Sequence, residues 1–292
     1  MDNFEKIIVF PNRLNNSKSS YIFLADLQKY IRDGSESKVL FDLSKCEFYH
    51  AIYISFLGTT LKVAENFGKK VTICTKRGSK VEVYLKRSGL YSYVTHDPFD
   101  YTNENTLPFC KISSENEEEV LSYIENIIGH APVKLTETAH ELLFQNIYEV
   151  FSNASEHSEE NLGVYAGGHW MPNSRELVFS IYDTGIGIPF LIKKMVAGVQ
   201  SSEEAVMWAL QQGNSTKQLE DGVPRGIGLS KLLSFIQLNK GRLDIFSNDI
   251  CYCIDKGHQY CFSLPNPIMG TFIGITIVAD KVHIYSTIKE IR

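Results

Sequence analysis

Polar residues at regular spacing mark the segment ELLFQNIYEVFSNASEH, from Glu141 to His157. Glu149, Asn153 and His157 follow one another at intervals of four residues, which places them on one edge of a helix. A carboxylate and a carboxamide one turn apart suit a magnesium-bound phosphate, because hard cations take oxygen ligands. The carboxylate is also a candidate general base toward a hydroxyl or a water. A solvated helix face is the alternative for this helix taken alone.

Two glycine-containing turns follow along the chain. Asp183-Thr184-Gly185-Ile186-Gly187 comes after the apolar run 176–182, which is typical of a strand, and Gly226-Ile227-Gly228-Leu229 opens a helical pattern that reaches residue 236. Glycine lets backbone N–H groups approach an anion, and a helix N-terminus favours negative charge there. Each turn alone is also what an ordinary loop needs. The order of the motifs along the chain is therefore the informative feature.

That ordered set resembles the GHKL superfamily of ATPases, which includes gyrases, heat-shock chaperones, histidine kinases and mismatch-repair proteins. It consists of Glu-x-x-x-Asn-Ala, Asp-x-Gly-x-Gly, Gly-x-Gly-Leu and Gly270-Thr271 before a strand, and it covers about residues 135–280. The resemblance implies a GHKL (Bergerat) α/β sandwich that binds ATP with Mg²⁺. Within this superfamily, the motifs most resemble those of anti-sigma-factor serine kinases.

The resemblance also assigns a role to each matching residue. Asn153 corresponds to the asparagine that holds magnesium, and Glu149 to the acid that activates the attacking nucleophile. Asp183 corresponds to the aspartate that accepts a hydrogen bond from the adenine amino group. The other expected nucleotide-binding residues belong to the two turns, the lid over residues 189–225 and the last motif: Gly185, Gly187, Lys217, Arg225, Gly226, Gly228, Leu229 and Thr271. For the two lid cations, a role at the γ-phosphate and a solvated position are both open.

Before these motifs the chain alternates between strand and helix patterns, which is typical of an α/β layer. Strands are expected at residues 6–10, 38–43 and 71–74, and helices at 21–31, 52–67 and 81–86. This order resembles a STAS domain, the fold of anti-sigma-factor antagonists, over about residues 1–97. The residues that carry the resemblance are the run VLFDLS at 39–44 and LKRSGL at 85–90.

One departure from the STAS pattern bears on function. Such antagonists place Asp-Ser before the second helix, whereas this chain has His50-Ala51. The resemblance therefore implies that the phosphoacceptor hydroxyl is missing, and Ser55 would replace it only by a shift of register. We expect the surface from His50 to Ser55 to bind a protein partner in one fixed state.

The predicted organisation is a STAS-like domain over residues 1–97, a linker with a connecting helix over 98–132, and the GHKL domain over 133–292. The linker part, 97–116, is polar with two prolines, and residues 117–128 show an amphipathic helix pattern. The 43% hydrophobic and 22% charged residues are those of an ordinary globular protein, and no apolar run is long enough to span a membrane. We expect a cytoplasmic protein that makes no membrane contact.

Charge is unevenly distributed. Residues 1–100 carry 15 basic against 11 acidic side chains, a net +4, and the remainder carries 14 against 23, a net −9. Neither part has the basic excess of a nucleic-acid-binding protein. Cys251, Cys253 and Cys261 with His258 are a possible zinc set, but their spacing is not the usual one, and reduced thiols are the alternative.

Three functions are open from the sequence. The first is an ATP-binding signalling regulator that transfers the γ-phosphate to a protein serine or threonine. The second is a GHKL ATPase that acts as a nucleotide-gated switch, with the STAS-like domain as a docking module. The third is a non-enzymatic ATP-binding module, against which the retained Glu149 argues. The partner would be a regulatory protein of STAS or anti-sigma type, or a second copy of the chain in a homodimer.

Overall fold

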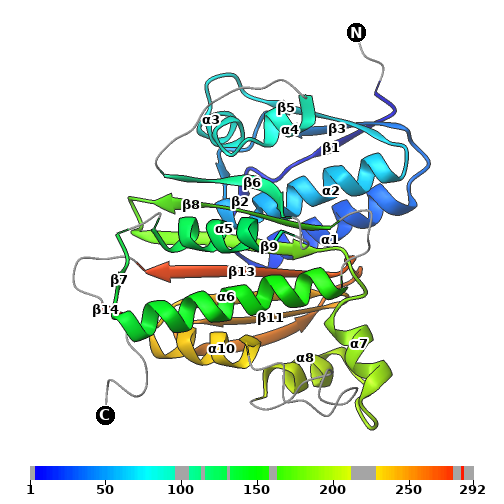
Figure 1. Ribbon diagram of the computed structural model, residues 1–292. Coiled ribbons are helices and arrows are strands. Elements are labelled where there is room, and N and C mark those ends of the chain that lie inside the picture. The colour runs from blue at the N-terminus through cyan, green and yellow to red at the C-terminus, as the bar shows by residue number, and fades with distance from the viewer. Residues whose placement is uncertain are drawn as a thin grey trace.

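The computed structural model describes residues 4–95, 105–112, 116–129, 132–157, 163–211, 228–278 and 284–285. Lys217, Arg225 and Gly226 lie outside these residues. The fold is a mixed α/β structure in which layers of sheet and helix alternate (Figure 1). Within the described ranges, no helix is long and apolar enough to cross a membrane.

The N-terminal part contains a three-stranded parallel sheet in the order β1-β3-β5. Its strands and the helices between and after them are β1 (Lys6–Val9), α1 (Lys18–Asp33), β3 (Lys38–Leu43), η1 (Ala51–Tyr53), α2 (Ile54–Asn66), β5 (Lys70–Thr75), α3 (Lys80–Arg87) and α4 (Leu90–Thr95). Two short strands, β2 (Arg13–Leu14) and β4 (Phe48–Tyr49), pair beside it. The strand–helix alternation expected from the sequence is confirmed.

The larger sheet has seven antiparallel strands in the order β12-β11-β10-β13-β9-β8-β6. The strands are β6 (Thr106–Ile112), β8 (Val164–Met171), β9 (Glu176–Asp183), β10 (Arg242–Ser247), β11 (Ile250–Asp255), β12 (His258–Ser263) and β13 (Thr271–Val278). Lys256 and Gly257 both have positive φ, +49° and +87°, and form the tight turn of the expected β11–β12 hairpin. A separate short pair joins β7 (Lys134–Leu135) to β14 (Ile284–Tyr285).

The helices described in this half of the chain are α5 (Glu117–Gly129), α6 (Glu137–His157), α7 (Ile188–Met195), α8 (Ser202–Leu210) and α10 (Gly228–Leu238). Helices α5, α6 and α10 cover one face of the seven-stranded sheet (Figure 1). On that face the strands supply alternate residues such as Ile181, Ile245 and Ile275, as the period of two requires. The other face supplies Tyr182, Phe246 and Phe272 to a second core.

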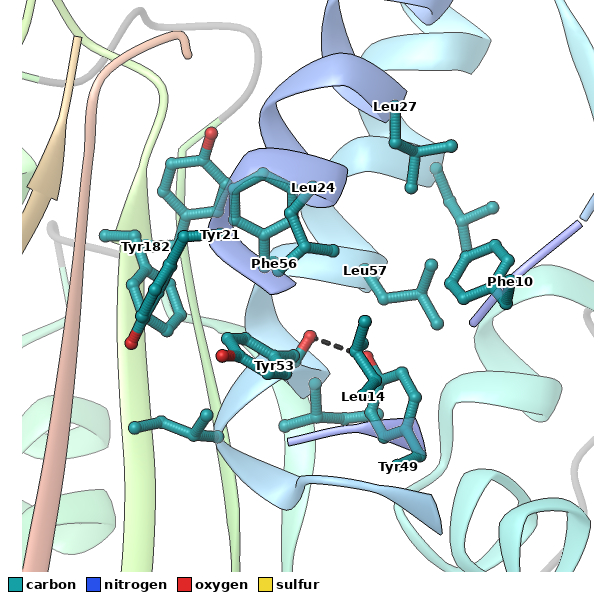
Figure 2. Packing of buried hydrophobic residues seen from close by; sticks show 14 of the residues in the cluster. Phe10, Leu14, Tyr21, Leu24, Leu27, Tyr49, Tyr53, Phe56, Leu57 and Tyr182 are labelled. Carbon is teal, nitrogen blue, oxygen red and sulfur yellow. Dashed lines mark hydrogen bonds between the residues drawn. The ribbon is translucent and has the colours of Figure 1, made fainter. Parts of the chain in front are cut away.

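The second core joins the seven-stranded sheet to the N-terminal part. Phe56 of α2 stacks on Tyr182 of β9 with ring centroids 5.1 Å apart, and on Phe246 of β10 at 5.7 Å. Figure 2 shows Phe56 of α2 between Tyr182 on one side and Leu57 and Phe10 on the other. Helices α1 and α2 are therefore buried between two sheets, and the two halves of the chain share one hydrophobic core.

This packing corrects the expectation of an external docking surface at residues 50–55. Ala51 is 4% exposed and Ser55 is fully buried, and the Ser55 hydroxyl lies 2.7 Å from that of Ser180 on β9. A side chain at Gly167 on β8 would collide with Ile54, so the close approach of helix and sheet requires glycine there. The partner of this surface is the chain's own sheet.

The segment expected as a linker also contains a strand. β6 pairs with β8 at one edge of the seven-stranded sheet, with a bulge between Leu107 and Cys110. Leu107 and Ile112 are buried in the helix-side core, although the polar flanks and Pro108 obscure the strand pattern in the sequence. The expected amphipathic helix at 117–128 is confirmed as α5.

Candidate functional site

Asp183, the last residue of β9, is a buried carboxyl without a cationic partner. It is 6% exposed, and its Oδ1 accepts a hydrogen bond of 2.9 Å from the backbone N–H of Gly185. None of the ion pairs found in the described part of the chain involves it. Burial raises its pKa to about 7, although the N–H groups of Gly185 and Thr271 oppose this shift. Such a carboxyl is stabilised in its ionised form by any further hydrogen-bond donor.

Thr271 and Ser247 lie beside Asp183 on the next two strands. The register pairs Asp183 with Thr271 and Thr271 with Ser247, so the three form one row across β9, β13 and β10. By alternation from Ile181, Ile273 and Ile245, all three face the layer of helices. The hydroxyls of Ser247 and Thr271 are 2.9 Å apart. The row is a small polar surface at the end of an otherwise apolar sheet face.

The turn after Asp183 is held against this row. Gly187 has a φ of +82° and precedes α7, whose first turn contains Pro189. The backbone N–H of Ile188 donates to the Ser247 hydroxyl at 2.9 Å. The Asn248 side chain donates to the carbonyl of Ile186 at 3.1 Å. Both expected turn glycines, Gly185 and Gly187, are therefore fixed relative to Asp183.

Gly270 has a special place in this arrangement. Its φ is +67°, and a Cβ atom there would overlap the backbone carbonyl of Asp183. Its own carbonyl accepts a hydrogen bond of 3.0 Å from the Ser247 hydroxyl. The expected Gly270-Thr271 motif thus lies directly against the expected Asp183 motif.

Helix α6 places the other expected residues over the sheet. In Figure 1 its C-terminal half lies at the end of the sheet where β9 ends and β13 begins. Glu149 Oε1 is buried and has no hydrogen-bond partner among the residues that the structure describes, and Asn153, one turn on, is half-buried. A buried oxygen without a donor costs free energy until one is supplied, so Glu149 suits a bound group that brings a donor or a hydrated cation.

Asn146, Ser247 and Asn248 were missed by the sequence reasoning. Asn146 is 1% exposed, and its amide nitrogen has no hydrogen-bond partner. The signal was present, because Asn146 precedes Glu149 by three residues and so shares its face of α6. Ser247 and Asn248 carried no such signal, because they act through contacts with segments about sixty residues away.

The second glycine turn is described only from Gly228, which begins α10. Leu229 is half-buried and packs against the helix-side core, and α10 lies beside α6. Lys217, Arg225 and Gly226 are outside the described residues. Among the rest, the structure places Asp183 beside Thr271, and it packs α6, which carries Glu149 and Asn153, against β9.

The N-terminal part contacts the site through Gln28 of α1. Gln28 is fully buried; its amide nitrogen donates to the Tyr182 hydroxyl at 2.6 Å, and its amide oxygen accepts from the backbone N–H of Met269 at 2.7 Å. The Tyr182 hydroxyl donates in turn to the Met269 carbonyl at 2.9 Å. This closed set of three hydrogen bonds fixes the turn that leads into Gly270.

The possible zinc set, which the sequence favoured less than reduced thiols, is not assembled. Cys251 and Cys253 are buried on the N-terminal side of the sheet with sulfurs 3.6 Å apart, whereas His258 is exposed. The described ranges contain no cluster of three or more side chains able to hold a metal ion.

Comparison with models of known protein families finds no match to this chain, and comparison with curated proteins finds no relative.

Proposed function

We propose that this chain binds ATP with Mg²⁺ in a GHKL-type site where β9, β13, α6 and α10 meet, and transfers the γ-phosphate to a hydroxyl of another protein. The observation that carries the proposal is Asp183, a buried carboxyl that has backbone donors and no cationic partner among the described residues. Adenine offers an amino donor of the size and polarity that such a carboxyl needs. Thr271 would lie beside the same base.

The chain's own residues divide the remaining work. Glu149 would accept the proton of the attacking hydroxyl, a role that suits a carboxylate oxygen held without a protein partner. Asn153 would hold the magnesium ion, which when bound neutralises charge on the phosphates. Gly228 and Leu229 would border the phosphates at the start of α10, with Gly226, Lys217 and Arg225 completing that side.

The acceptor hydroxyl belongs to another molecule in this proposal. Ala51 has none, and the Ser55 hydroxyl is buried against Ser180 under the sheet. A regulatory protein of STAS or anti-sigma type is the partner that the resemblance suggests, and a second copy of the chain is the alternative.

A nucleotide-gated switch is the second candidate, and one observation favours it. Gln28 ties α1 to the turn before Gly270, so a change at the adenine end of the site reaches the N-terminal part through buried hydrogen bonds. In this reading the acceptor is water, and the partner responds to the bound nucleotide.

Incubation of the full chain with γ-labelled ATP and magnesium, with and without candidate STAS partners, separates the two. Label on a partner protein supports the kinase, and label in free phosphate supports the switch. Asn153→Ala should impair binding of ATP with magnesium far more than binding in chelator. The matched control is Asn66→Ala, at the end of α2 and distant in the fold. Absence of ATP binding by the unaltered chain would refute both candidates.

A further inference from the structure

A cavity lies at the end of the seven-stranded sheet opposite Asp183. It has a volume of about 150 Å³ and is bordered by the turns before β10 and after β11, by β13 and β9, and by Asn16 and His50 of the N-terminal part. An engineered cavity of about that volume in another protein binds benzene. The space therefore suits a molecule of about six non-hydrogen atoms, and none of the expected nucleotide-binding residues borders it.

The inner wall of this cavity is a closed set of ionic contacts. Arg242 donates to both oxygens of Asp244, at 2.9 and 2.8 Å, and to Asp255 at 3.1 Å. Asn16 bridges the same pair, accepting from Arg242 at 2.9 Å and donating to Asp244 at 2.8 Å. Because the Arg242 guanidinium is already matched by two carboxylates, it forms a fixed wall and is not the cation that a ligand would meet.

The outer side chains place opposite charges on two sides of the cavity. Lys240 and Lys256 lie together on the β10–β11 side, because the backbone N–H of Lys256 donates to the carbonyl of Gly241 at 3.0 Å. Glu176 lies on the other side, at the start of β9, where it pairs with Val278 of β13. The ion pairs within the described ranges use none of these three charges. Besides the paired Arg242 and Asp255, the cavity is therefore bordered by two positive groups on one side of β13 and by one negative group on the other.

Thr276 supplies an independent sign of a ligand. It lies on β13 between the two sides, paired with Arg242 in the register, and it borders the cavity. The residue is 6% exposed, and its Oγ1 has no hydrogen-bond partner among the described residues. Buried hydroxyls are normally satisfied, so a polar molecule in the cavity is the missing partner.

We propose that this cavity binds a small zwitterion of the free amino-acid type. Its carboxylate lies toward Lys240 and Lys256, its ammonium group toward Glu176, and one of its polar atoms hydrogen-bonds the Thr276 hydroxyl. A simple anion would satisfy the lysines and leave Glu176 unmatched, and a simple amine would do the reverse. Because Asn16 and His50 border the same space, the bound molecule contacts both halves of the chain.

Thermal unfolding and calorimetry of the full chain test this proposal directly. A panel of free amino acids at about 10 mM is compared with propionate and with propylamine, which carry one of the two charges each. At least one amino acid should raise the unfolding temperature and bind saturably, since a ligand of the native state stabilises it. An equal response to propionate would overturn the zwitterion, and no response to any amino acid would overturn the site.

Variants then assign the contacts. Thr276→Val replaces an unpaired hydroxyl by a methyl group of similar shape, so it should raise the unfolding temperature without ligand while weakening amino-acid binding at least tenfold. Glu176→Gln should weaken amino-acid binding by a similar factor. Lys76→Gln, an exposed lysine after β5, is the matched control and should change neither. Unaltered binding in both cavity variants would refute the proposal. Retained ATP binding by Thr276→Val shows that its effect is separate from the proposed nucleotide site.

Discussion

Two aspartates are buried in the seven-stranded sheet, and their surroundings are opposite. Asp244, on β10, is fully buried and is bound by both the guanidinium of Arg242 and the amide of Asn16. Asp183, on β9, is 6% exposed and is met by backbone N–H groups alone, so burial raises its pKa to about 7. They also face opposite sides of the sheet, toward the N-terminal part and toward the helix layer.

The difference separates a structural carboxyl from a candidate binding carboxyl. A buried charge that its own chain has paired holds elements together, and here it joins β10 to Asn16. A buried carboxyl that its chain leaves without a counter-ion destabilises the unliganded fold when ionised, and such groups are enriched at functional sites. We therefore expect the fold to depend on Asp244 and not on Asp183.

Removing the partner of Asp244 should cause the largest loss in the free energy of unfolding. Arg242→Leu leaves a fully buried carboxylate without its cation, which is expected to cost about 3–5 kcal/mol of unfolding free energy. Urea unfolding followed by circular dichroism measures this loss. Arg77→Leu, in the exposed turn after β5, is the matched control and should cost little. If Arg242→Leu lowers the free energy of unfolding no more than the control does, the structural role of Asp244 is contradicted.

Asp183→Asn should instead raise the free energy of unfolding of the unliganded protein at neutral and alkaline pH. Its folded pKa of about 7 lies above the ordinary value of 3.8, so its contribution to stability is full below pH 3.8 and is lost as the pH rises through 7. At pH 8 the neutral amide should therefore stabilise the free protein by roughly 2–4 kcal/mol, at 1.36 kcal/mol per pKa unit. Destabilisation at pH 8 in the same unfolding assay would show that the carboxylate supports the fold.

The same substitution should weaken ATP binding. Loss of one charge-assisted hydrogen bond to the adenine amino group is expected to cost about 1.5–3 kcal/mol, or roughly 10- to 150-fold in affinity. Calorimetric titration with ATP and magnesium measures it, and Asp33→Asn, at the end of α1, is the control. Equal affinity in Asp183→Asn and the unaltered chain would remove Asp183 from the adenine pocket.

The pH dependence of ATP affinity sharpens this assignment. If the amino group binds the ionised carboxylate, affinity should rise by about tenfold between pH 6 and pH 8, because ionisation with a pKa of about 7 lies between them. Asp183→Asn should remove most of this rise. A pH profile that is the same in both proteins would assign the dependence to the nucleotide phosphates or to another group.

The titration of His50 should have the smallest effect, a change in protein stability with pH. Its burial lowers the pKa to about 4, with Asp244 opposing and Arg242 adding to this shift, and its Nδ1 accepts from the Ile52 N–H at 3.3 Å. The folded pKa lies below the ordinary 6.5, so stability is full above 6.5 and is lost as the pH falls toward 4. About 1 kcal/mol should be lost between pH 7 and 5.5. His50→Gln should remove that slope, and an unchanged slope would point to other groups.

Local patterns predicted most of the elements. The strand at Lys38–Leu43 is found with the expected bounds, and the hairpin at Lys256-Gly257 follows from turn chemistry alone. Asp183 at the end of one strand and Thr271 at the start of another were predicted, and the register pairs them on adjacent strands. The strand and the hairpin depend on residues near one another in sequence.

Long-range packing was not predictable in the same way. Residues 54–61 contain no charge and are buried throughout, which fits a helix covered on both sides, but the sequence does not say by what. Gln28, Asn146 and Ser247 are ordinary polar residues until the segments they contact are known. Strand β6 pairs with β8, which lies much later in the chain, so its own sequence does not predict the pairing.

The burial of α1 and α2 between two sheets has a consequence for how the chain is made. Their second covering layer is complete only when β13, which ends at Val278, has left the ribosome, and the contact of Asn16 with Asp244 spans 228 positions. At about 5–20 residues per second, the apolar surfaces of both helices wait tens of seconds for their partner strands. During synthesis the N-terminal part thus exposes apolar helix surface that its own later strands cover, and such surface is prone to aggregation until it is covered.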